Sequence, residues 1–318
     1  MSRKRYPSDL TDKQWRIFSL YIPAPKDGGR PAEIERREIV NAILYVTTQG
    51  ISWRSVPHDF PHWFTVYSYF RTWCRAGIWE SANAALVQKE RILTGRDPQR
   101  RRDGFSNGQD HGLGQSGTVL AQLQHLTGWA AFRACPPKRG LERGYDGNKK
   151  VKGRKRFLIT DTFGRILKCH VCAANTGERT GGRALLHSIK ARWVKLKAAF
   201  VDGGYSGVDF KAEIKASTGI TLEHVATPNA YREFAQVMGF PPQAGEFEQA
   251  IKEWRAGQKG FVVQAKRWVV ERTNAWMLTC RRLRVDYEVL PRHSEGFIYL
   301  AMCRILLIRL AKCPRLVV

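Results

Sequence analysis

Apolar residues in the first 95 positions recur every three or four residues, a spacing that places them on one face of an α-helix. Thr11 and Gln14 have the spacing of a capping box, so a first helix is predicted to start there. A second helix is expected to end at Gly50, and two more are expected over about 64–75 and 81–94. The pattern therefore predicts an all-helical N-terminal part.

Downstream of residue 140 the pattern alternates between short apolar runs and amphipathic segments. The predicted strands are about 156–160, 165–174, 198–201 and 220–225, and the predicted helices are about 182–193, 208–216, 268–282 and 294–312. A turn over Asp161–Gly164 joins the first two strands. Two strands joined by a turn, then a helix and a strand, are typical of a mixed sheet with helices packed on it, so the second half is predicted to be α/β.

The net charge is the feature of the composition that most restricts the range of possible functions. Among 318 residues, 53 Lys and Arg oppose 28 Asp and Glu, which gives a net charge of +25. Such an excess indicates a polyanionic partner, and nucleic acid is the first candidate. A membrane is less favoured because no uncharged apolar stretch reaches the roughly 18 residues of a spanning helix. There is no secretory signal, and seven scattered cysteines fit reduced thiols, so a cytoplasmic protein is expected.

Two carboxylates are the strongest candidates for chemistry. Asp202 follows an apolar strand, at the strand end where α/β sheets bind their ligands. Glu271 lies in a predicted helix, one turn after Arg267. Carboxylates from a strand and a helix could together hold Mg²⁺. The spacing alone also fits an ordinary turn at Asp202 and an exposed ion pair between Arg267 and Glu271.

Five segments of the chain resemble bacterial insertion-sequence transposases of the DDE class. They are Tyr6–Thr11, Trp53–His58, Gly144–Arg156, Asp202–Tyr205 and Arg267–Arg272. The resemblance implies an N-terminal helical DNA-binding domain over 1–95 and an RNase H-like catalytic domain over 144–318. A linker and an atypical segment over 96–143 would separate them.

The same resemblance implies a function and a site. The protein would bind the terminal inverted repeats of its element, cleave the phosphodiester with Mg²⁺ (or Mn²⁺) and join the 3′-OH to target DNA. Asp202 and Glu271 would be metal-binding catalytic residues, and Arg267 would orient Glu271 or contact phosphate. Double-stranded DNA in the bacterial nucleoid would be the partner, and a homo-oligomer on DNA is compatible with this function.

Basic and aromatic clusters are the candidates for DNA contact, since Lys and Arg neutralise phosphates. An ordinary solvated surface is the alternative for each cluster. A basic RNA-binding module is disfavoured because the stacking motifs of common RNA-binding folds are missing. The candidate residues are Tyr67, Arg71, Arg75, Lys149, Lys150, Lys152, Arg154, Lys155, Arg156, Arg281 and Arg282.

The chain departs from the family pattern at the first catalytic aspartate, which the family carries in an apolar strand shortly before the Gly-Tyr-Asp segment. The only acids in 101–140 are Asp103 and Asp110, and Asp110 is the better candidate. Gln264 and Leu278 also replace the Tyr and Lys that often flank the glutamate. We therefore expect no proper strand in 101–140. The alternative function is a catalytically inactive, transposase-derived DNA-binding protein.

Cys169 and Cys172 have the spacing of half a zinc site, but no second pair accompanies them. A buried strand explains the same pattern, and it is the favoured interpretation.

Overall fold

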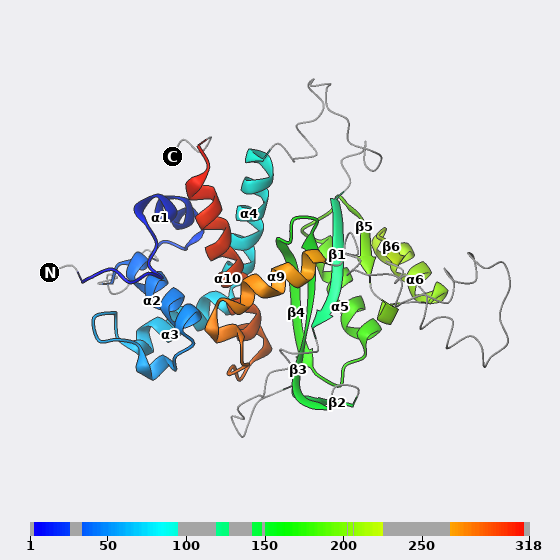
Figure 1. The fold of residues 1–318 in the computed structure, drawn as a ribbon, viewed down its shortest axis with the longest axis horizontal. Coiled ribbons are helices and arrows are strands. Elements are labelled where there is room, and N and C mark those ends of the chain that lie inside the picture. Colours follow the sequence, from blue (N-terminus) through cyan, green and yellow to red (C-terminus); the bar gives the residue numbers. More distant parts are fainter. Residues whose placement is uncertain are drawn as a thin grey trace, which may run out of the picture.

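A computed structural model gives the fold (Figure 1). It describes residues 3–25, 34–94, 119–126, 142–147, 150–201, 203–205, 207–224 and 268–314, with 119–126, His224 and Trp268 described as backbone only. A bundle of helices lies beside a mixed sheet, and α9 (Trp268–Leu278) runs from one to the other. The predicted combination of a helical N-terminal region with an α/β part is confirmed.

The N-terminal helices are α1 (Asp12–Phe18), α2 (Arg36–Gln49), α3 (Trp63–Arg75) and α4 (Ile78–Leu93). The capping box is confirmed, because the Gln14 amide donates to the Thr11 hydroxyl and the Gln14 side chain accepts from the Thr11 amide. α2 ends at Gly50, where φ is +73°, as predicted for a left-handed residue without a Cβ. The start of α1 and the end of α2 are therefore set by local residues.

The core of this bundle is completed by a helix from the other end of the chain. α10 (Pro291–Lys312) packs against all four N-terminal helices, and Figure 1 shows it among them. Phe297 of α10 stacks on Phe70 of α3 with 4.4 Å between ring centroids. Gly296 lies against Cys74 and Trp79, at a position where a Cβ would collide with the Cys74 sulfur. The helical unit is thus built from both termini of the chain, and 1–95 does not contain all of it.

The sheet combines antiparallel and parallel pairs. Its strands are β1 (Val119–Leu126), β2 (Gly144–Asp146), β3 (Val151–Asp161), β4 (Ile166–Ala173), β5 (Leu196–Val201) and β6 (Thr221–His224). The order across the sheet is β4-β3-β1-β5-β6, and β2 pairs with the first residues of β3. β3 is antiparallel to β4 and β1, whereas β1, β5 and β6 are parallel to one another.

The expectation that 101–140 forms no proper strand was wrong. β1 lies in this stretch and occupies the centre of the sheet, between β3 and β5. Its sequence, Val-Leu-Ala-Gln-Leu-Gln-His-Leu, has an apolar residue at alternate positions over most of its length. A central strand needs backbone partners on both sides, and β3 and β5 supply them.

Helices cover the sheet and one of its edges. α5 (Glu178–Lys190) packs on β1, β3 and β4, and α6 (Val208–Thr218) packs on α5 and β6. At the β4 edge, the amide of Cys169 donates to the Tyr299 hydroxyl at 3.0 Å. The amide of Val171 donates to the Glu295 carboxylate at 2.8 Å. α10 therefore satisfies edge amides that would otherwise be open to another strand.

Two smaller predictions concern cysteines and membranes. Cys169 and Cys172 are buried in β4, which agrees with their interpretation as strand residues. The cysteines within the described ranges are all free thiols. No helix of the part of the chain that the structure describes is long and apolar enough to cross a membrane.

Candidate catalytic site and DNA interface

The chain on both sides of Asp202 is well anchored, although Asp202 itself lies outside the described residues. Val201, the last residue of β5, is buried and pairs with β1 and β6. The 3₁₀ turn Gly203–Tyr205 follows, and Tyr205 is fully buried against Gly182 of α5. The predicted strand that leads to Asp202 is thus present, at the carboxyl end where ligand-binding residues of open sheets lie.

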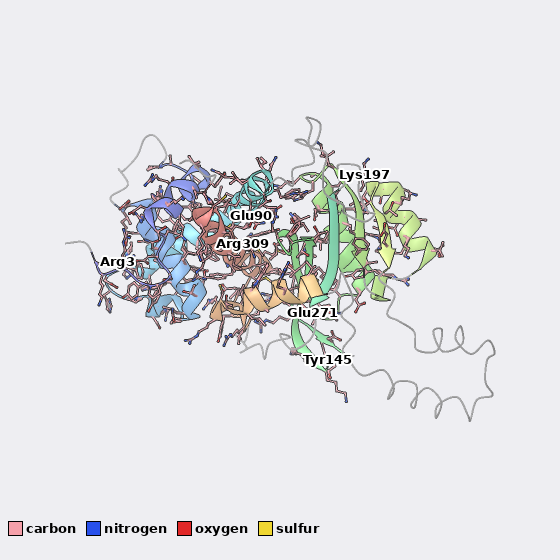
Figure 2. All side chains as sticks on the ribbon, turned by 45° about the horizontal axis from the view of Figure 1, so that its top comes forward. Arg3, Glu90, Tyr145, Lys197, Glu271 and Arg309 are labelled. Carbon is pink, nitrogen blue, oxygen red and sulfur yellow. The ribbon has the colours of Figure 1, made fainter. Side chains whose placement is uncertain are left out.

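The second candidate carboxylate, Glu271, lies in the first turn of α9 and is exposed. Figure 2 shows it on the part of α9 that lies next to the sheet. Arg267 precedes the helix and lies outside the described residues, so its predicted pairing with Glu271 stays a prediction. The first turn of a helix favours a carboxylate, because the helix dipole is positive there.

The donor set can be compared with what a divalent metal needs. Among the described residues, no three His, Cys, Asp or Glu side chains gather as a metal-binding group, and Asp202 is not one of those residues. Asp202 and Glu271 would supply carboxylate oxygens, which are the ligands that Mg²⁺ prefers. The side chains of these two residues are therefore of the chemical type that binds Mg²⁺.

The central strand offers no third carboxylate. β1 contains neither Asp nor Glu. Its last residue in register with β5 is Leu123, which pairs with Val201. Gln124 follows Leu123 in the chain, and Asp202 follows Val201. The position on β1 that corresponds to Asp202 is therefore occupied by an amide residue. The other candidate, Asp110, lies outside the described residues.

An open pocket of about 530 Å³ lies beside the turn that follows Asp202. Asp146, Glu178, Arg179 and Gly204 are among its lining residues. Asp146 is buried and lies 3.6 Å from the Lys155 ammonium, so this acid of the Gly-Tyr-Asp segment has a structural ion pair. Sequence reasoning did not single out Glu178 or Arg179, and only the fold brings them to this turn.

Several predicted DNA-contact residues do lie at the surface. The exposed ones are Arg71 and Arg75 of α3, Lys150 and Lys152 at the start of β3, and Arg281. Tyr67 of α3 is half-buried, with its ring 5.3 Å from the ring of Trp53, so it packs within the bundle. Lys149 lies outside the described residues. The exposed cations are thus distributed over both the bundle and the sheet.

The second half of the basic run is buried, and this corrects the interpretation of Arg154, Lys155 and Arg156 as phosphate contacts. Arg154 donates to Asp286 at 3.1 Å and to the Glu288 carbonyl at 2.9 Å. Arg156 donates to the Leu283 carbonyl at 3.0 Å. Lys155 donates to the Thr176 carbonyl at 3.1 Å. These side chains tie β3 to its neighbours, because the loop before α10 and the residues after β4 cover the strand.

Arg282 is corrected in the same way. Its guanidinium donates two hydrogen bonds to one Glu288 oxygen, at 2.9 and 2.6 Å, and a third to the Ile51 carbonyl at 2.8 Å. The side chain is 6% exposed, and it joins the segment after α9 to the bundle. A buried guanidinium with three such bonds is not available to a phosphate.

Comparison with known proteins assigns the family. Residues 10–83 match the family described as "Putative transposase of IS4/5 family". Residues 129–306, more than half of the chain, match the transposase DDE domain family, and neither match includes 84–128. The chain is also 26% identical over 113 residues to the insertion element IS402 uncharacterized 16.2 kDa protein of Burkholderia cepacia. That similarity covers 33% of this chain and 76% of the relative. The chain therefore belongs to the transposase DDE domain family.

Proposed function

We propose that this transposase binds the terminal inverted repeats of its element, cleaves the DNA at the ends and joins the 3′-OH to target DNA. The observation that carries the proposal is the arrangement of β5 and α9. Asp202 directly follows β5, and Glu271 lies exposed in the first turn of α9, on the part next to the sheet. The strand order β4-β3-β1-β5-β6, antiparallel on one side and parallel on the other, supports an RNase H-like fold.

Asp202 and Glu271 would hold Mg²⁺ or Mn²⁺ in this function. The metal, when bound, would supply activation of a water or 3′-OH and stabilise charge on the leaving oxygen. Glu271 would contribute a carboxylate fixed by the backbone of α9. Arg267 would orient that carboxylate or contact a DNA phosphate.

The exposed cations support binding to double-stranded DNA in the cytoplasm. Arg71 and Arg75 lie one helical turn apart on α3, so they point to the same side of the helix. Lys150, Lys152 and Arg281 add exposed positive charge. Together with the net charge of +25, they give the polyanion-binding character that a transposase needs.

Substitution of Glu271 by Gln tests this proposal. The amide keeps the shape of the side chain but is a poorer ligand for Mg²⁺, so metal-dependent cleavage of end DNA should fall by orders of magnitude. Affinity for the same DNA and the melting temperature should stay close to those of the wild type. Glu223→Gln, which alters an exposed carboxylate on β6, is the matched control. Unchanged cleavage by Glu271→Gln would refute the metal-binding role.

A second candidate function is favoured by the composition of β1. We propose as the alternative that the chain binds DNA without cleaving it, because the central strand lacks a carboxylate and the family matches omit 84–128. Gln124→Asp separates the two functions. If position 124 takes the place of the first aspartate, this variant should gain Mn²⁺-dependent cleavage over an inactive wild type. Strong cleavage by the wild-type chain would exclude the alternative, and Asp110→Asn would then show whether Asp110 contributes.

A further inference from the structure

The turn between β3 and β4 is docked onto the helix that carries Glu271. The Thr273 hydroxyl of α9 lies 2.8 Å from the Gly164 carbonyl and 3.0 Å from the Val269 carbonyl of its own helix. Gly164 has a φ of +77°, and a Cβ at this position would lie 2.5 Å from the Thr273 oxygen. The close approach therefore requires glycine in the turn and a small hydroxyl residue on the helix.

A second hydrogen bond and a ring stack extend this contact. The Arg272 guanidinium donates to the Phe163 carbonyl at 2.9 Å. The Trp276 indole has the Arg272 guanidinium 4.7 Å and the Arg309 guanidinium 4.4 Å from its ring centroid. Consecutive carbonyls of the turn, at Phe163 and Gly164, thus accept from consecutive side chains of α9.

The turn itself is held rigidly. The Asp161 carboxylate accepts hydrogen bonds from the amides of Phe163 at 2.9 Å and Arg165 at 3.0 Å. Gly164 donates its amide to the Asp161 carbonyl at 2.9 Å. The Arg165 side chain is 2% exposed and lies 2.9 Å from Glu90 of α4. The turn is therefore tied to the sheet and to the helical bundle at once.

We propose that the Asp161–Arg165 turn sets the position of α9 in the site, and that Thr273 and Gly164 are positioning residues for Glu271. This inference rests on the proposed function, in which Glu271 binds metal. Glu271 and Thr273 lie two residues apart on an 11-residue helix, so loss of the Thr273 contact would change where the Glu271 carboxylate lies. Residues that orient metal ligands typically affect metal affinity by about 10- to 100-fold.

The experiment compares Mn²⁺ binding, measured by electron paramagnetic resonance, in four variants of the full-length protein. Thr273→Val removes the hydroxyl and keeps the shape, and Thr273→Ser restores the hydroxyl. Thr47→Val is the matched control, because the Thr47 hydroxyl is also fully buried and bonds only the Ile43 carbonyl of its own helix, at 2.7 Å. Glu271→Gln removes the proposed ligand. The melting temperature of each variant is measured alongside.

We expect Thr273→Val to weaken Mn²⁺ binding by about tenfold or more, with a melting temperature that falls no further than that of Thr47→Val. Thr273→Ser should recover most of the affinity. Wild-type Mn²⁺ affinity in Thr273→Val, beside weakened binding in Glu271→Gln, overturns the positioning role and leaves the proposed function standing. Wild-type affinity in Glu271→Gln overturns the proposed metal site itself, and the positioning role falls with it.

Discussion

The guanidinium of Arg165, in the β3–β4 turn, forms an ion pair with the Glu90 carboxylate of α4 at 2.9 Å. Both side chains are buried, at 2% and 11% exposed. Arg309 of α10 approaches the same carboxylate at 3.6 Å, and Figure 2 shows Glu90 and Arg309 close together. One carboxylate therefore joins the sheet, the N-terminal helices and the C-terminal helix.

Glu90→Gln should destabilise the fold by about 1–3 kcal/mol, because the buried Arg165 charge loses its closest partner and keeps only Asp161, at 3.6 Å. Glu80→Gln on the same helix is the control. Its ion pair with Lys168, at 2.6 Å, is more exposed, so its loss should cost about 1 kcal/mol or less. Urea unfolding of both variants measures the difference. Equal stabilities would contradict a special role for the buried pair.

A fragment of residues 1–95 should not fold cooperatively, although its helices were predicted as a self-contained domain. The core of the bundle lacks α10 in this fragment, and Phe70 and Trp79 lose the apolar face that covers them. We expect helical circular dichroism without a sigmoidal thermal transition. A synthetic peptide spanning 290–314 should restore the transition. Cooperative melting of 1–95 alone at the temperature of the full chain would show that α10 is dispensable.

Exposed and buried arginines should differ in their effect on DNA binding. Arg71→Ala and Arg75→Ala should each lower the slope of log K against log salt by about one, with no change in melting temperature. Arg154→Ala should instead lower the melting temperature, since it removes the guanidinium that donates to the Asp286 carboxylate and to the carbonyls of Glu288 and Val289. Fluorescence anisotropy with end DNA at several salt concentrations provides the slopes. If Arg71→Ala and Arg75→Ala both keep the wild-type slope of log K against log salt, α3 does not take part in the DNA interface.

His293 should make the folded state sensitive to acid. Burial, together with the positive charges of Arg292, Arg71 and Arg154, lowers its pKa from 6.5 to about 4. The unfolded chain takes up a proton near pH 6.5, whereas the folded chain does so only near 4, so stability is lost as the pH falls through this range. His293→Gln should remove this part of the loss. Urea unfolding at pH 7 and pH 4.5 checks the prediction, and identical losses in wild type and variant would contradict it.

Local patterns were sufficient for most elements of the fold. The capping box at Thr11, the end of α2 at Gly50 and the turn over Asp161–Gly164 each depend on residues within a few positions. The helix predicted over about 182–193 corresponds to α5, and the amphipathic spacing of Leu185, Leu186 and Ile189 places these three residues on its buried face. These features depend on backbone propensity and on the alternation of apolar and polar side chains, which a linear sequence displays directly.

Other properties were decided by segments far apart in the chain. The basic run of β3 has the sequence of an exposed strand, yet Arg154 and Arg156 are buried because the 283–290 segment supplies carboxylates and carbonyls. β1 contains two Gln residues and a His, which are unusual in a central strand. Pairing with β3 and β5 nevertheless places it in the centre of the sheet. Thr273 gains its partner only where α9 meets the turn at Gly164. Whether a charge faces solvent or a buried partner is thus set by long-range packing, because the free energy of burying it depends on which donors and acceptors the fold brings to it.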